Sequence, residues 1–156
     1  MSLLIFSCSS KAQKQTADTD RQSDKRILVA YFSCTGTTEK VDWNDRASLN
    51  SVEMADEKSR PALGGETIDL KDYDVVLLGY PIWWDLCPRP VNTFLEKYDF
   101  AGKTVIPFAT SGGSSITGSV KQLKKLYPKI EWKEGRLFNG GTANVAGWSK
   151  QIIEKL

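Results

Sequence analysis

The chain contains no histidine, and that absence removes several classes of chemistry. Histidine-based acid and base catalysis, Ser-His-Asp triads and most transition-metal sites are excluded. The chain also lacks a large net charge, because 21 Lys and Arg residues balance 19 Asp and Glu residues to a net charge of +2. The composition therefore gives no reason to expect nucleic acid as a partner. We expect any redox chemistry to come from a bound cofactor.

The chain also lacks an apolar run of the roughly 20 residues that a membrane-spanning helix needs. Its N-terminal segment, MSLLIFSCSS at residues 1–10, resembles the end of a bacterial lipoprotein signal, in which cleavage before Cys8 leaves that thiol to carry a lipid. Such a signal would tether the protein to the bacterial cell envelope, whereas an ordinary flexible N-terminus would leave it cytoplasmic. Residues 11–24 have hardly any apolar side chains, so we expect 1–24 to be a signal remnant with a flexible tether and 25–156 to be one domain.

A strand that runs directly into a hydroxyl-rich turn organises the rest of the chain. Residues 27–32, ILVAYF, are typical of a strand covered on both faces in a parallel α/β sheet. The turn SCTGTT at residues 33–38 surrounds a glycine with hydroxyls, and glycine lets backbone N–H groups come close to a ligand. The turn lacks the Gly-Lys-Ser/Thr ending of an NTPase P-loop, and no GxGxxG dinucleotide pattern is present. We therefore predict a phosphate held by neutral donors, with a plain strand-to-helix cap as the alternative.

Three stretches, in order along the chain, resemble the flavodoxin family. The turn at 33–38 is similar to the loop that cradles the phosphate of FMN, and GYPIWW at residues 79–84 and ATSGGS at residues 109–114 are similar to the two loops that flank the flavin ring. The resemblance implies an α/β fold, a flavodoxin-like three-layer sandwich around a parallel sheet, with FMN as cofactor. It implies phosphate contacts at Ser33, Thr35, Gly36, Thr37 and Thr38, and ring contacts at Tyr80, Pro81, Ile82, Trp83, Trp84, Thr110, Ser111, Gly112 and Gly113.

Each ring-side loop also has a plain structural interpretation. Trp83 and Trp84 would pack on the neighbouring helix instead of on a flavin. The second loop, at residues 110–119, would be a connector that caps the following helix with Ser or Thr. Cys34 and Cys87 lie on loops at the same end of two strands that we expect to be neighbours, so they would either form a disulfide after export or remain two buried thiols.

The segment after the phosphate turn, residues 38–72, departs most from the family. It has neither a sustained helical period nor an alternating run, so the family's first helix and second strand look deleted. We expect the strand order 2-1-3-4-5 to be reduced to about four strands, 1-3-4-5. The strand at 27–32 should then be an unpaired apolar edge that either pairs with a second copy of the chain or makes the protein poorly soluble, and one sheet face should lose a covering helix.

The remaining elements follow the order of the family. Buried strands are expected at residues 74–81 and 104–108, and a short last strand at 132–137. Helices are expected to begin near Pro88, to run from about residue 118 to 127, and to end the chain at residues 142–156.

Three functions are compatible with these observations. The first is FMN-dependent transfer of electrons to a redox partner protein or a small-molecule acceptor. The second is an FMN-dependent NAD(P)H:quinone-type reductase, which would turn over a nicotinamide cofactor. The third is a cofactor-free flavodoxin-fold binding module, which would be colourless and oligomeric through the strand at 27–32. None of the three gives a side chain a catalytic role, and we expect no metal site.

Overall fold

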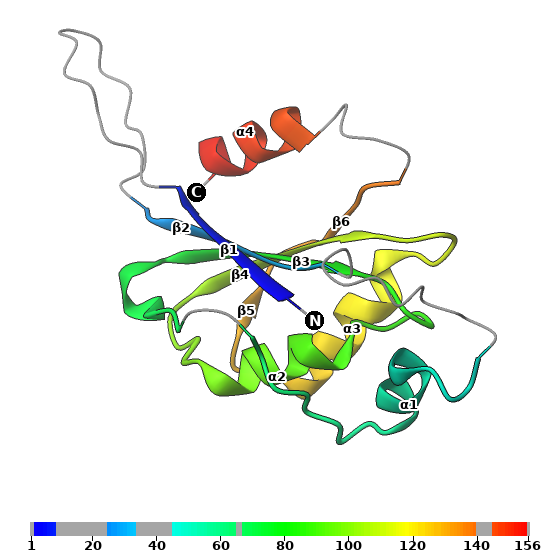
Figure 1. The fold of residues 1–156 in the computed structure, drawn as a ribbon. Coiled ribbons are helices and arrows are strands. Elements are labelled where there is room, and N and C mark those ends of the chain that lie inside the picture. Colours follow the sequence, from blue (N-terminus) through cyan, green and yellow to red (C-terminus); the bar gives the residue numbers. More distant parts are fainter. Residues whose placement is uncertain (1, 9–24, 34–44, 65–66, 140–144, 156) are drawn as a thin grey trace, which may run out of the picture.

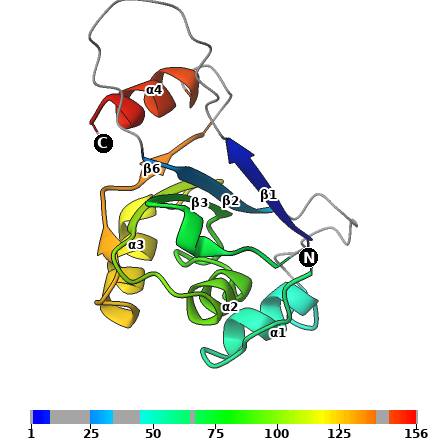
Figure 2. The ribbon, with the colours of Figure 1, turned by 90° about the vertical axis from the view of Figure 1, so that its left-hand side faces the viewer.

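A sheet with helices on both faces makes up the protein. The structure is a computed structural model and describes residues 2–8, 25–33, 45–64, 67–139 and 145–155. Figure 1 and Figure 2 show three layers, with α4 on one face of the sheet and α2 and α3 on the other. The elements along the chain are β1 (Ser2–Cys8), β2 (Ile27–Ser33), α1 (Leu49–Ala55), the 3-10 turn η1 (Leu70–Asp72), β3 (Val75–Pro81), α2 (Arg89–Lys97), β4 (Thr104–Thr110), α3 (Ile116–Leu126), β5 (Glu131–Trp132), β6 (Arg136–Leu137) and α4 (Val145–Lys155).

Parallel strands form the centre of the sheet. β2 pairs with β3, beginning at Ile27 opposite Val75, and β3 pairs with β4 from Val75 opposite Thr104 to Pro81 opposite Thr110. β5 and β6 both pair in parallel with β4, near its two ends, so they act as two pieces of one outer strand. The expected order 1-3-4-5 is confirmed, because β2, β3, β4 and the β5 and β6 pieces occupy those positions.

The outer edge of β2 is covered by β1, so the expectation of an unpaired edge is wrong for this structure. β1 is antiparallel to β2 and pairs with it from Ser2 opposite Ser33 to Cys8 opposite Ile27. An exposed row of unpaired N–H and C=O groups is unfavourable, and a segment of the same chain can satisfy it. The reason for expecting a dimer through β2 is therefore absent while β1 is in place.

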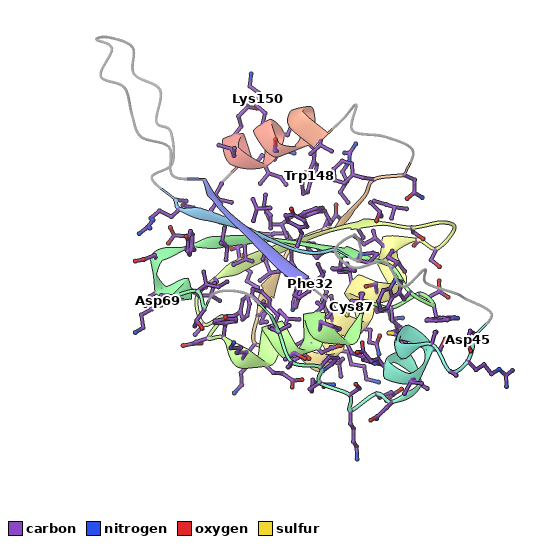
Figure 3. All side chains as sticks on the ribbon, viewed as in Figure 1. Phe32, Asp45, Asp69, Cys87, Trp148 and Lys150 are labelled. Carbon is purple, nitrogen blue, oxygen red and sulfur yellow. The ribbon has the colours of Figure 1, made fainter. Side chains whose placement is uncertain are left out.

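The two faces of the sheet bury different amounts of apolar side chain, because successive side chains of a strand point to opposite faces. The face toward α2 and α3 carries a large core cluster that includes Leu28, Leu78 and Phe94, all with no exposed surface. Figure 3 shows Trp148 pointing from α4 toward the opposite face, and Lys150 pointing away from it. That opposite face has a small buried cluster with partly buried side chains packed on it: Val75, Leu77 and Ile106, then Ile27, Val29, Phe108, Trp148 and Ile152.

A short helix, α1, lies in the segment where the sequence pattern predicted no regular element. Ser48 caps its N-terminus by accepting a hydrogen bond from the N–H of Ser51 at 3.3 Å. At its other end the buried Arg89 side chain donates to the carbonyl oxygens of Glu53 and Met54, at 3.4 and 2.8 Å. These bonds satisfy helix-end groups that have no partner inside the helix. Seven residues are too few to show a clear helical period, which is why the pattern missed α1.

The other helices agree with the sequence to within a few residues. α2 follows Pro88 as expected, and α3 begins at Ile116 because the side chain of Ser115 accepts a hydrogen bond from the Thr117 N–H at 3.1 Å. The capping interpretation of the loop before α3 is therefore correct for Ser115. α4 is described from Val145 onward. None of the helices in the described ranges is both long enough and apolar enough to cross a membrane.

Candidate functional site

The two proposed ring loops leave the sheet side by side. β3 and β4 end at Pro81 and Thr110, which are paired with each other at the carboxyl ends of these parallel strands. The N–H of Ile82 donates to the carbonyl oxygen of Thr110 at 2.9 Å, so the pairing continues into the first loop. Open α/β sheets bind their ligands at this end of the strands. The structure therefore brings the two loops to the position where a ligand is expected.

The first loop makes a tight turn with a strained backbone. Trp83 and Leu86 exchange two backbone hydrogen bonds of 2.9 Å, and the residues between them, Trp84 and Asp85, have φ angles of 45° and 66°. Residues other than glycine rarely adopt positive φ, and each such residue costs about 1–3 kcal/mol. The turn also separates the two tryptophans, since Trp83 is 2% exposed and Trp84 is 47% exposed. The loop thus holds one indole in the protein and presents the other at the surface.

Side-chain hydrogen bonds shape the second loop. Ser111 Oγ accepts from the N–H groups of Gly113 and Ser114, at 3.1 and 2.8 Å. The N–H of Ser111 itself donates to Asn139 Oδ1 at 3.0 Å, which ties the loop to the segment after β6. These bonds occupy the N–H groups of Ser111 and Gly113. The N–H of Gly112 donates to no residue in the described part of the chain, so it can donate to a ligand.

Two ionisable side chains behind the first loop are kept neutral by burial. The hydroxyl of Tyr80 accepts a hydrogen bond from Ser119 Oγ at 2.9 Å, and burial raises the pKa of Tyr80 well above its usual value. The Cys87 thiol lies 3.9 Å from Asn92 Oδ1, and burial raises the pKa of this thiol to about 12. Neither group is charged at neutral pH. Cys87 is a free, buried cysteine in this structure, as the buried-thiol alternative expects, whereas Cys34 lies outside the described residues.

A pocket of about 680 Å³ lies between the two loops, the sheet and α4. Its volume falls in the range of small-molecule binding sites. None of the described residues that line it is ionisable, so the polar groups of these residues are hydroxyl, amide, indole N–H and backbone groups. The lining residues are Val29, Leu77, Pro81, Ile82, Trp83, Phe108, Thr110, Ser111, Gly112, Phe138, Asn139, Val145, Trp148 and Ser149. Such a wall suits an uncharged ring system better than a charged group.

The predicted ring contacts divide into two groups. Tyr80, Trp84 and Gly113 do not line the pocket: Tyr80 lies against Ser119, and Gly113 is bonded back to Ser111. The contacts that do line the pocket are Pro81, Ile82, Trp83, Thr110, Ser111 and Gly112.

The predicted phosphate site remains a prediction. Ser33 ends β2, four residues after the pocket-lining Val29, but its side chain is outside the described set. Thr35, Gly36, Thr37 and Thr38 lie wholly outside the described residues. No group of three or more His, Cys, Asp or Glu residues that could hold a metal occurs in the ranges that the structure describes.

Sequence reasoning missed the part of the pocket formed by α4 and by the segment after β6. Asn139 had a usable signal, because a polar residue directly after a short parallel strand belongs to the ligand-binding edge of the sheet. Trp148 had none, since a helical period shows that a face is buried but not what lies opposite that face. Its position over Phe108, with ring centroids 5.8 Å apart, depends on how α4 crosses the sheet.

Known proteins with similar sequences have a similar fold. The family model described as Flavodoxin matches residues 37–152. A protein of Bacteroides uniformis ATCC 8492, assigned provisionally as a flavoprotein and solved by crystallography, is 47% identical, with a TM-score of 0.72 over 80% of this chain and 97% of that chain. A similarly assigned protein of Bacteroides eggerthii DSM 20697 is 51% identical, with a TM-score of 0.67 over 75% of this chain and 74% of that chain.

A curated relative is also similar over part of its length. The flavodoxin-like domain-containing protein BilS of Clostridioides difficile (strain CD3) is 29% identical over 108 residues. The alignment covers 67% of this chain but only 59% of that relative. The chain therefore spans about three fifths of the curated protein that it matches.

Proposed function

Because the chain belongs to the flavodoxin family, we propose that it binds FMN non-covalently and serves in the transfer of one or two electrons. When bound, FMN supplies the electron chemistry that the side chains of the pocket lack. The observation that carries the proposal is the neutral pocket walled by both ring-side loops, which begin at the paired residues Pro81 and Thr110. The provisional assignment of two similar crystal structures as flavoproteins supports a flavin as the ligand.

The described residues fit the flavin ring in distinct roles. Pro81 and Trp83 supply apolar surface on one side of the pocket, and aromatic surface next to a planar ring is favourable. Gly112 supplies a backbone N–H for a ring carbonyl oxygen from the other loop. Asn139 positions that loop through its bond with the Ser111 N–H. The phosphate would bind at the turn after β2, through the hydroxyls predicted there.

The first test is the absorption spectrum of the protein after addition of FMN and removal of the excess by gel filtration. We expect retained bands near about 370 and 450 nm, because the bound cofactor carries the colour. A folded protein that stays colourless would overturn the proposal and would favour the cofactor-free binding module. Turnover of NAD(P)H by the coloured protein would instead favour the reductase.

A pair of substitutions at one glycine tests the proposed contact. Gly112→Pro removes the N–H, and we expect FMN to bind about tenfold more weakly, because one hydrogen bond contributes about 0.5–1.5 kcal/mol. Gly112→Ala keeps the N–H, and its added Cβ would meet no atom within 4 Å, so it is the matched control. Equal dissociation constants for the two variants, measured by flavin fluorescence, would remove Gly112 from the site.

The partner and the location are further parts of this proposal. The electrons would pass to a redox partner protein or to a small-molecule acceptor, and lipidation of Cys8 would hold the protein at the bacterial cell envelope. Mass spectrometry of the mature protein from cells tests the anchor. A chain that begins at Cys8 and carries the added mass of lipid supports it, whereas an intact N-terminus favours a cytoplasmic protein.

A further inference from the structure

The pocket continues past the two loops to an apolar floor formed by the sheet and α4. This floor lies on the face of the sheet opposite α2 and α3, with residues from β2, β3, β4 and α4, among them Val29, Leu77, Phe108 and Trp148. We propose that it is a second binding site, which takes an uncharged, mostly apolar ring compound. Its use in electron exchange rests on the proposed function, but the binding itself does not.

The aromatic wall of this site is already assembled in the protein. Phe108, Phe138 and Trp148 contact one another edge to face, with ring centroids 5.8 Å apart for Phe108 and Trp148, 5.2 Å for Phe138 and Trp148 and 6.4 Å for Phe108 and Phe138. Edge-to-face contacts of this kind hold rings in fixed orientations. The surface that a flat apolar ligand would contact is therefore preorganised, so binding would cost little side-chain entropy.

Charged side chains lie near the site but do not line it. The Arg136 guanidinium lies over the Phe138 ring, 5.8 Å from its centroid, and is not among the lining residues. None of the described lining residues is ionisable, and Lys150 on α4 points away from the sheet, where it lies 3.9 Å from Glu154 (Figure 3). A phosphate, pyrophosphate or carboxylate buried against this wall would lose its water without gaining a counter-charge from any of the described lining residues. The floor therefore disfavours a nicotinamide dinucleotide and selects a neutral compound.

A few polar groups set the number of oxygen atoms that the ligand can carry. Asn139 Oδ1 already accepts from the Ser111 N–H, whereas its Nδ2 donates to no residue in the described part of the chain. Thr110 adds a hydroxyl group to the wall. One or two carbonyl or hydroxyl oxygens on an otherwise apolar ring would match these groups.

The test uses two probes with the same ring and different charge, 2-naphthol and 2-naphthalenesulfonate. Calorimetric titration at neutral pH, with and without saturating FMN, should show saturable binding of the neutral probe at least tenfold tighter than binding of the sulfonate. Equal binding of the two probes, or no saturable binding, would overturn the proposal. Displacement of 2-naphthol by FMN would also overturn it, because the floor would then belong to the flavin itself.

A matched pair of substitutions on α4 locates the site. Val145 lines the pocket and is 40% exposed, whereas Ile153 is 42% exposed and does not line it. Val145→Lys should weaken 2-naphthol binding at least fivefold, and Ile153→Lys should leave it unchanged. Equal effects of the two variants would overturn the assignment. A chain that binds 2-naphthol with this pattern but retains no FMN would keep the neutral site and reject the proposed function.

Discussion

The two faces of the sheet are formed by the same strands, but one face carries most of the buried core and the other borders the pocket. Toward α2 and α3, side chains from every central strand join one large buried cluster. Toward α4, only a small cluster is buried, and the space beside it is a pocket. The stability of the fold is therefore concentrated on one face, which leaves the other face free to bind a ligand. A binding site of this size is compatible with a stable domain because alternate side chains of the same strands pack the core and line the pocket.

Truncation of a core aromatic on each face should give the largest contrast. Phe94 on α2 has no exposed surface and contacts the rings of Phe32, Tyr98 and Phe100 at centroid distances of 5.8, 5.2 and 5.6 Å. We expect Phe94→Ala to lower the free energy of unfolding by about 3–5 kcal/mol, measured by urea denaturation. Trp148→Ala on α4 should lower it by less than half as much, because Trp148 is only partly buried. Equal decreases in unfolding free energy for the two variants would contradict the conclusion that the stability is concentrated on the α2 and α3 face.

One point on the α4 face is tightly packed, and a single methyl group should reveal it. A Cβ atom at Gly79 would lie 2.3 Å from Phe108 Cζ and 2.8 Å from Tyr31 Cβ. Gly79→Ala should therefore cost about 1–3 kcal/mol of unfolding free energy and displace the Phe108 ring that lines the pocket. Gly112→Ala meets open space and should change stability by less than about 0.5 kcal/mol. If Gly79→Ala left the unfolding free energy unchanged, the Phe108 ring would have to be able to move at no cost in stability.

The smallest expected effect concerns an ion pair on the α2 face and its counterpart on α4. Arg60 donates two hydrogen bonds of 2.8 Å to the Glu96 carboxylate, and these hold the pKa of Glu96 below its ordinary value. The carboxylate thus stabilises the fold above its ordinary pKa, and that contribution is lost as the pH falls through the lowered pKa. Glu96→Gln should lower the unfolding free energy by less than about 1 kcal/mol at neutral pH, because the ion pair is partly exposed. The unfolding free energy of this variant should also decrease less than that of the unmodified protein as the pH is lowered.

The control for this prediction lies on the opposite face. Glu154 is 3.9 Å from Lys150 on α4, and both side chains are well exposed. Glu154→Gln should therefore change the unfolding free energy less than Glu96→Gln does. Urea denaturation at a series of pH values between about 3 and 7 compares the two variants. A steeper acid loss in Glu96→Gln than in the unmodified protein would contradict the sign of the argument.

The parallel core of the fold was predictable because its signals are local. Val75, Val76, Leu77 and Leu78 form a continuous apolar run, and such a run is buried on both sides wherever the strand sits in the sheet. α1 and β1 were not predictable in the same way. α1 is held by the Arg89 side chain from another helix, and that contact leaves no pattern within α1 itself. β1 contains a short apolar run, Leu3 to Phe6, but the run does not show that the segment pairs antiparallel with β2.

The sequence predicted the loops of the candidate site but not the part of the pocket that the sheet and α4 form. Pro81 to Trp83 and Thr110 to Gly112 were identified from motifs that directly follow strands, and the parallel register of β3 and β4 brings them together. Tyr80 was placed at the ring although its side chain points to the other face, where it meets Ser119. A strand that alternates its faces can carry a ring contact at one residue and a core residue at the next, and the motif alone does not say which.

If residues 1–10 are a signal that is cleaved before Cys8, that cleavage and the pairing of β1 with β2 exclude each other. Cleavage before Cys8 would remove every residue of β1 except Cys8, and with them the backbone groups that close the edge of β2. The backbone of a segment already paired in a sheet is less accessible to a processing enzyme than that of an unpaired segment. Folding and N-terminal processing would therefore compete in time. Whichever comes first decides whether the edge of β2 is closed by its own chain or left open to another.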